Sequence, residues 1–323
     1  MFKKLYNQAR IVYQVKPVTP LLIKTGKESF DPTKPDMEFV RTRTPYGEVP
    51  YLPGSSLKGV IRSHGERIVR TLNLKCCDLT AKDCGRKINK ETPLEDRYGE
   101  HCYICKTFGS TSLSSRMRIT DANPWSVEAG DEEIASIAAS LDSHVPTSRR
   151  TNVKIDRQKG ASAGTALFDT EVVTGGSFQG EIVLVNYQLW QLALLSLVFR
   201  DIDSGFQRVG ASKSRGLGRV SFQVRDFQLQ QYGALAAEPG ELRGIGCLED
   251  KLVQRYKLIG SDCLSSLPSD LMRDEILSTP GFMNCYRPEG EARDTWSELA
   301  KTLVQGQSWQ SFIEEGEKHE SAS

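Results

Sequence analysis

The sequence of 323 residues contains no run of 18 apolar residues, the length that a membrane-spanning helix needs. Its longest apolar segment, Leu189 to Phe199, is too short to cross a bilayer. The first residues, Met1-Phe2-Lys3-Lys4, lead directly into polar sequence, which is not the pattern of a secretory signal peptide. Internal repeats and low-complexity runs are also missing. We therefore expect a globular, cytoplasmic protein without a membrane partner.

Net charge is nearly absent as well, since 42 Lys and Arg face 41 Asp and Glu. This balance conceals two unlike parts. Residues 1–225 hold 33 Lys and Arg against 24 Asp and Glu, and residues 226–323 hold 9 against 17. A basic body favours a polyanionic partner, and an acidic tail favours contact with a basic protein surface.

Apolar periodicity predicts an α+β fold. Segments in which apolar and polar residues alternate predict strands. Apolar residues at helical spacing predict a helix at about 56–72, and a largely apolar segment predicts another at about 187–203. The serines of Pro53-Gly54-Ser55-Ser56 are expected to cap the first helix. The order, without insertions, is β-α-β-β-α-β, which is the ferredoxin-like or RRM-like arrangement. The expected strands are 9–15, 116–122, 167–173, 180–186 and 219–229.

Five of the eight cysteines lie within 30 residues, in a segment (73–110) that does not fit this core. Cys102-Tyr-Ile-Cys105 is a knuckle whose two thiolates can occupy adjacent corners of a zinc tetrahedron. Cys84 and either Cys76 or Cys77 would complete the set, although their spacing is wider than usual, and His101 is a spare candidate. The alternative is a group of free thiols, because a cytosolic protein rarely forms disulfides. We expect a structural Zn²⁺ held by Cys77, Cys84, Cys102 and Cys105.

The segment Gly210-Ala-Ser-Lys-Ser-Arg-Gly-Leu-Gly-Arg219 combines small residues with three cations. Its glycines permit positive φ and a close approach of backbone N–H groups to a ligand, and Lys213, Arg215 and Arg219 supply charge. A phosphate chain suits both properties. A flexible turn with solvated charges is the alternative.

Four ordered motifs resemble the RAMP superfamily of type III CRISPR effector complexes. They are Leu52-Pro-Gly-Ser-Ser-Leu-Lys-Gly59 followed by Arg62, the knuckle with Lys106-Thr-Phe-Gly109 and Ser115-Arg-Met-Arg-Ile-Thr-Asp-Ala122, the stretch from Asn152-Val-Lys-Ile-Asp-Arg157 to Glu171, and the glycine-rich loop. The resemblance spans residues 20–225 and is closest to the backbone subunits, which line guide RNA and in many members cut the paired target RNA.

This resemblance implies a RAMP domain over residues 1–230, with a zinc-binding insertion at 73–110 and a thumb hairpin at 142–170. An acidic, mainly helical extension follows at 231–323. The implied partners are guide RNA, target RNA and other CRISPR effector subunits. The expected RNA-binding residues are Ser55, Ser56, Lys58, Arg62, Arg149, Arg150, Lys154, Arg157, Lys213, Ser214, Arg215 and Arg219.

The resemblance also implies a catalytic carboxylate between the first strand and the first helix, just before an apolar pair and an arginine. Asp36, in Asp36-Met-Glu-Phe-Val-Arg41, matches that position. It would help remove the proton of an RNA 2′-OH, with Mg²⁺ or alone, which makes the chain an RNA-guided endoribonuclease.

Two other functions remain open at this point. The subunit can be purely architectural, holding guide RNA without cutting. It can also process precursor guide RNA by acid–base chemistry, for which His64 and His144 are weak candidates. His64 lies on the apolar stripe of the first helix, which favours a packed residue.

Overall fold

The computed structural model describes residues 3–26, 33–77, 83–89, 91–93, 96–155, 158–159, 162–236 and 240–320. Within these residues, six antiparallel strands form one sheet in the order β11-β12-β8-β1-β7-β4. The expectation of a mixed α+β protein is confirmed. The strands are β1 (Asn7–Pro17), β4 (Met117–Ile119), β7 (Phe178–Val185), β8 (Val220–Tyr232), β11 (Leu271–Arg273) and β12 (Met283–Pro288).

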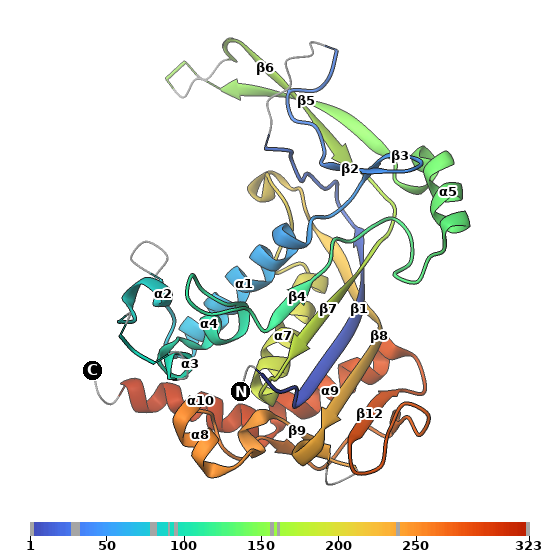
Figure 1. Ribbon diagram of the computed structural model, residues 1–323. Helices are drawn as coiled ribbons and strands as arrows, with labels where there is room; N and C mark the ends of the chain where they lie inside the picture. The colour runs from blue at the N-terminus through green and yellow to red at the C-terminus, as the bar shows by residue number, and fades with distance from the viewer. Residues whose placement is uncertain are drawn as a thin grey trace.

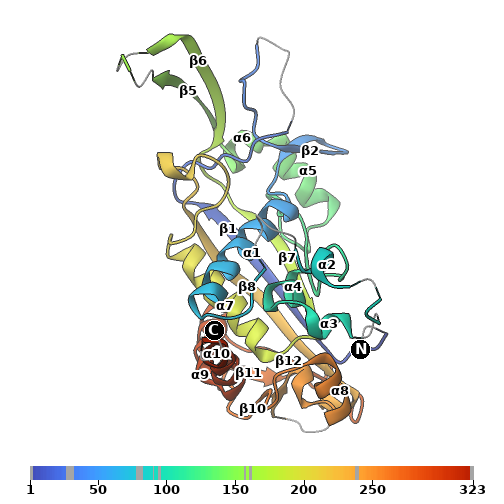
Figure 2. The same ribbon diagram turned by 90° about the vertical axis from the view of Figure 1, so that its left-hand side faces the viewer.

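The core lies between this sheet and the helices on one of its faces. Helices α1 (Gly54–Thr71) and α7 (Leu189–Asp203) lie side by side there, as Figures 1 and 2 show. Helix α7 contacts α1 and strand β8, and it also contacts helices α9 (Ala292–Gln305) and α10 (Gln307–Glu320). Because neighbours surround it, α7 is apolar on nearly every side.

The start of α1 differs from the serine caps that we expected. The helix begins at Gly54, and Pro53 occupies the N-cap position without a side-chain hydrogen bond. Instead, the Gly54 N–H donates to Asp121 Oδ1 at 2.7 Å. The helix is therefore capped by a carboxylate that follows the neighbouring strand β4, a partner that local sequence does not reveal.

A long hairpin extends from one end of the molecule (Figure 1). It consists of β5 (Thr147–Ile155) and β6 (Ser162–Val173), which pair only with each other as strands. Leu167 to Val173, one of the expected strands, therefore lies in this hairpin and not in the central sheet. A second hairpin, β2 (Arg41–Thr44) and β3 (Gly47–Pro50), lies before α1.

Short helices make up the insertions. The cysteine-rich segment contains α2, α3 and α4, and two helices precede the long hairpin. Their bounds are α2 (Cys84–Lys87), α3 (Arg97–Glu100), α4 (Tyr103–Phe108), α5 (Asp131–Ala139) and α6 (Leu141–His144).

The C-terminal residues are built into the core. Strands β12 and β11 extend the sheet beyond β8, and Phe312 of α10 stacks on Trp190 of α7 with ring centroids 4.4 Å apart. Buried Asp262 accepts hydrogen bonds from the Leu189 N–H (2.8 Å), the Gly246 N–H and the Ser308 hydroxyl. Its burial raises its pKa to about 6. The remaining elements are η1 (Lys213–Arg215), η2 (Gly233–Ala236), β9 (Leu242–Arg243), η3 (Ile245–Cys247), α8 (Asp250–Tyr256) and β10 (Cys263–Leu264).

Over the described residues, no helix is both long and apolar enough to span a lipid bilayer.

The contact between α1 and β4 makes a prediction about two glycines of the same helix. A Cβ on Gly54 would lie 2.8 Å from the carbonyl oxygens of Ile119 and Thr120, whereas a Cβ on Gly59 meets nothing within 4 Å. We expect Gly54→Ala to lower the free energy of unfolding by about 1–3 kcal/mol through overpacking. Gly59→Ala should raise it by up to about 1 kcal/mol, because alanine is the better helix former. Urea unfolding measures both, and equal stability of the two variants would contradict this packing.

Candidate metal centre and nucleic-acid interface

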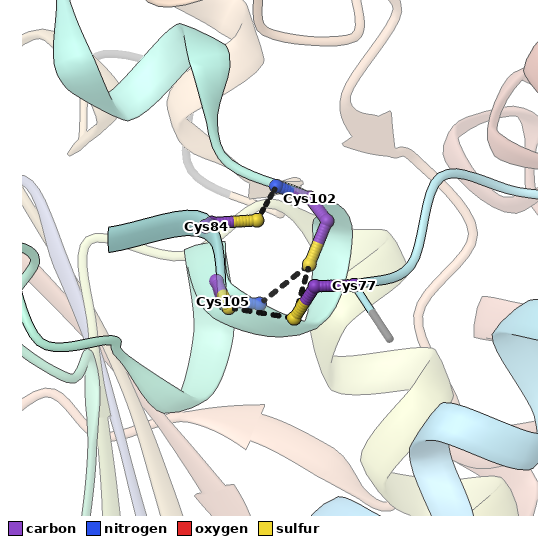
Figure 3. Close-up of side chains that lie close together, drawn as sticks. All are labelled: Cys77, Cys84, Cys102 and Cys105. Atoms are coloured by element: carbon purple, nitrogen blue, oxygen red, sulfur yellow. Dashed lines mark hydrogen bonds between the residues drawn. The ribbon is translucent and has the colours of Figure 1, made fainter. Parts of the chain in front are cut away.

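Four buried cysteines converge beside the C-terminal half of α1 (Figure 3). Cys102 is the N-cap of α4 and Cys105 lies one turn later, Cys84 begins α2, and Cys77 follows α1. The Sγ atoms of Cys77 and Cys105 are 3.5 Å apart, those of Cys77 and Cys102 are 3.8 Å apart, and all four lie within 4.8 Å of one another. The structure thus groups Cys77, rather than Cys76, with the other three.

This geometry fits a tetrahedral zinc ion. Zn–S bonds of about 2.3 Å give sulfur–sulfur edges of about 3.8 Å. Donors also surround the sulfurs: the N–H of Cys102 donates to Cys84 Sγ, the N–H of Cys105 to Cys102 Sγ, and Arg62 Nη2 to Cys105 Sγ at 3.7 Å. Such donors stabilise metal-bound thiolates. Four protein ligands leave no open position, so a metal here would be structural.

Without a cation, the four thiols cannot all ionise. The hydrogen bond with Cys102, together with burial, raises the pKa of Cys84 to about 11. Hydrogen bonds from Cys105 and from Cys76 hold the pKa of Cys102 far below its usual range. A divalent ion would supply the positive charge that allows clustered thiols to deprotonate together.

His101, the spare ligand candidate, does not join the cluster. Its Nδ1 lies 2.5 Å from the carbonyl oxygen of Arg97, and its Nε2 lies 2.8 Å from Ser110 Oγ. Both ring nitrogens therefore have partners in the insertion.

The glycine-rich loop adopts the positive φ angles that its sequence predicts, but it uses them for contacts within the protein. A Cβ on Gly210 would collide with the carbonyl oxygen of Leu22. The N–H of Ala211 donates to that same oxygen at 2.7 Å, and the N–H of Gly218 donates to Pro20 O at 3.0 Å. The N–H groups of Ala211 and Gly218 are thus not available to a phosphate.

The side chains of this loop form an exposed basic surface. Lys213, Ser214, Arg215 and Arg219 are all exposed. Within the part of the chain that the structure describes, none of the three cationic side chains pairs with a carboxylate. A charged group that is free of internal partners is suited to contact a polyanion.

Two arginines that sequence reasoning missed enlarge this surface. Arg67 of α1 donates from Nη1 to Gln207 Oε1 at 3.1 Å, and Arg208 donates to the Lys213 carbonyl at 3.0 Å. Burial lowers the pKa of Lys213, and the nearby charge of Arg67 lowers it further. Arg67 is far from the loop in sequence, so only the packing of α1 on α7 reveals the proximity.

Lys58 and Arg62, expected to line the RNA, direct their charges inward. Lys58 Nζ donates to Ser115 Oγ (2.8 Å) and to the Met117 carbonyl (3.0 Å). Arg62 donates to Glu66, to the Gly109 carbonyl and to Cys105 Sγ. Lys58 therefore ties α1 to the start of β4, and Arg62 ties α1 to the cysteine-rich insertion. Ser55 is exposed and Ser56 is half-buried at the start of the same helix.

The hairpin presents Arg149 and Arg150 on β5, both exposed. Arg149 pairs with Asp169 at 2.6 Å, whereas Arg150 has no carboxylate partner among the residues described. Val153 and Leu167 face each other across the strands and are 46% and 65% exposed. Lys154 is part of β5, but its side chain lies outside the described residues, as does Arg157.

Asp36 lies against the base of this hairpin and is exposed. Its Oδ2 accepts a hydrogen bond from the Asp169 N–H at 2.8 Å, and Met37 pairs with Thr170 of β6. Arg41 and Glu171 form a bidentate ion pair of 2.6 and 2.7 Å that fastens the same segment to β6. The Asp36 carboxylate is therefore held in place at the molecular surface.

A small apolar cluster joins the hairpin, the glycine-rich loop and the chain that leads to Asp36. Leu22, Val172 and Leu217 are buried against one another, and Leu21 pairs with Val173. The cluster thus connects the chain leading to Asp36, the base of the hairpin and the glycine-rich loop. It brings the expected acid and the expected cations to one end of the molecule.

His64 does not belong to this surface, whereas His144 lies just before the hairpin. His64 is 9% exposed, and its Nε2 lies 2.7 Å from Asp201 Oδ2 between α1 and α7. His144 is exposed beside Ser140, on the short helix before the hairpin. The placement of His64 agrees with its interpretation as a packed residue.

The family model of the RAMP superfamily matches residues 14–221, roughly two-thirds of the chain. The matched span runs from β1 into β8 and includes the cysteine cluster, the hairpin and the glycine-rich loop. A comparison with curated proteins finds no match.

We expect one zinc ion per chain, bound by the four clustered cysteines. Cys77→Ser should lose the metal and lower the unfolding midpoint, because a structural site contributes its binding energy to folding. Cys76→Ser, which changes a neighbouring thiol that is not one of the four grouped ligands and leaves a hydroxyl able to hydrogen-bond Cys102, is the matched control and should keep full occupancy. Elemental analysis of the purified variants measures the number of zinc ions per chain. Metal loss in the Cys76 variant alone, or metal-free wild type, would contradict this ligand set.

Proposed function

Because this chain belongs to the RAMP superfamily, we propose that it is a guide-RNA-binding backbone subunit of a type III CRISPR effector complex that cuts complementary target RNA. Membership itself implies a CRISPR-associated function in RNA binding. The strand order β8-β1-β7-β4, with α1 and α7 on one face, supports a ferredoxin-like or RRM-like core. The exposed, unpaired cations of the glycine-rich loop are the observation that carries the RNA-binding proposal.

Guide RNA binding is assigned to the basic surface. Lys213, Arg215 and Arg219 contact phosphates, with Arg67 and Arg208 adding to the local positive potential. These contacts hold the backbone and do not read the bases, so binding is independent of guide sequence. Lys58 and Arg62 are assigned to positioning α1, because their charges have internal partners.

The hairpin is assigned the role of a thumb. Arg149 and Arg150 supply cations along β5, and the sequence adds Lys154 and Arg157, while the exposed pair Val153 and Leu167 offers an apolar wedge. Apolar side chains inserted between bases unstack them and distort the strand. A target strand paired to the guide would be distorted next to Asp36.

Cleavage is assigned to Asp36. The RNA 2′-oxygen attacks the adjacent phosphorus, its proton passes to the Asp36 carboxylate directly or through water, and the bond to the 5′-oxygen breaks as that oxygen takes a proton. The products are a 2′,3′-cyclic phosphate and a 5′-hydroxyl. Proteins commonly hold hydrated Mg²⁺ through one or two carboxylates, so exposed Asp36 is compatible with that ion, which would offset phosphate charge.

The architectural alternative differs only in this last step. The acidic C-terminal residues are assigned to contacts with other effector subunits in both cases. For precursor processing, His64 is not favoured as the base because it is buried against Asp201, which leaves exposed His144 as the candidate.

Lys213→Ala combined with Arg215→Ala should weaken binding of single-stranded RNA by about tenfold or more, since each hydrogen bond to a charged group is worth on the order of 1 kcal/mol or more. The slope of log affinity against log salt should shrink by roughly 0.7 for each phosphate that is no longer neutralised. Arg293→Ala with Lys301→Ala removes the same charge from exposed positions of α9 and is the matched control. Fluorescence anisotropy over a salt series measures both. Equal affinity and slope in the two double variants would contradict the assignment.

Asp36→Asn should abolish one cleavage position while RNA binding stays near wild type. The asparagine carbonyl can still accept the Asp169 N–H, so the local structure is retained while the charge is removed. We expect the rate at that position to fall by about 10²–10⁴-fold, as for a missing acid–base group. The assay is cleavage of labelled target RNA by the reconstituted complex with Mg²⁺. An unchanged product pattern would make this subunit architectural.

A further inference from the structure

Phe206, in the turn that follows α7, is a large aromatic side chain that is 81% exposed. We propose that its ring is a stacking platform for one unpaired base of an RNA whose phosphates contact the basic surface. This inference rests on the proposed RNA binding and assigns it a base-binding position. No sequence motif singled out this residue.

The turn around Phe206 is rigidly built. Gly205 has a φ of +82°, which favours glycine, and its N–H donates to the Ile202 carbonyl. Gln207 on the other side is 4% exposed; its N–H donates to the Asp201 carbonyl and its Nε2 to the Arg208 carbonyl. The exposed ring is therefore carried between two anchored residues, so stacking on it costs little ordering entropy.

Cations from separate segments surround this turn. Arg67 of α1 donates to Gln207, the residue next to Phe206. Arg219 passes beside Gly205, where a Cβ would lie 3.0 Å from its Nε. Arg208 follows two residues after Phe206 and binds the carbonyl of Lys213. The exposed ring thus lies in a turn that has these three arginines nearby, while the neighbouring carboxylates of Asp201 and Asp203 are bound by other residues.

This combination matches how proteins hold single-stranded nucleic acid. Cations follow the backbone while an aromatic ring stacks on a base, and stacking is tolerant of sequence because every base has a π face. A protein partner would instead bury apolar area, for which any apolar side chain of similar size suffices. The two occupants therefore respond differently to replacement of the ring by leucine.

The test is binding of labelled oligouridine by the full-length chain, followed by anisotropy. Phe206→Ala should weaken binding by about 5- to 140-fold, the range expected when one base–aromatic stack is removed. Phe206→Leu should bind as weakly as the alanine variant, and Phe206→Trp should bind at least as well as wild type with its added fluorescence quenched by RNA. Phe282→Ala, which removes another exposed phenylalanine from the C-terminal part, is the matched control and should bind like wild type.

Each contrary outcome has a distinct meaning. If Phe206→Ala binds like wild type while Lys213→Ala with Arg215→Ala does not, stacking is overturned and the proposed RNA binding stands. Full affinity of Phe206→Leu also overturns stacking. If wild type does not bind RNA, the proposed function fails together with this inference. Unfolding midpoints equal to wild type are expected for the Phe206 variants because the ring is exposed, and they exclude misfolding as the cause.

Discussion

The close packing of the glycine-rich loop on the chain at residues 20–23 is the constraint on which the functional surface depends. Gly210 has no room for a side chain there, and Ala211 and Gly218 donate their N–H groups to carbonyls of that segment. Leu22 in turn packs against Val172 of the hairpin. Positive φ and the missing Cβ thus serve the protein's own assembly. The exposed cations are presented by a loop that is anchored through the N–H groups of Ala211 and Gly218.

The basic and acidic parts of the sequence form one folded body with two unlike ends. The basic loop and the hairpin lie at one end, while α9, α10 and the added strands cover the other end (Figures 1 and 2). Asp36 lies at the hairpin end, because its carboxylate accepts the Asp169 N–H of β6. Asp262 joins the acidic part of the sequence to the basic part, because its buried carboxylate accepts the first N–H of α7 and the hydroxyl of Ser308. The C-terminal residues therefore support α7, the helix that leads directly into the basic surface.

Sequence reasoning succeeded where local pattern determines the outcome. The alternation of β1 and β8, the apolar run of α7 and the Cys102–Cys105 knuckle all predicted what the structure contains. It failed where the contacts of a residue depend on a partner that is distant in the sequence. The cap of α1 comes from Asp121, the charges of Lys58 and Arg62 are bound by residues far along the chain, and Arg67 joins the basic surface only through helix packing. Cys77 lies in the cysteine cluster as predicted, although spacing alone did not separate it from Cys76.

The central claim is that RNA lies across the end of the molecule formed by the glycine-rich loop and the hairpin. Ultraviolet crosslinking of the native ribonucleoprotein, with mass-spectrometric mapping of the crosslinked peptides, tests it most directly. The account predicts crosslinks in residues 204–219 and 147–173. Crosslinks confined to α8, α9 and α10, or a purified complex without RNA, would contradict it.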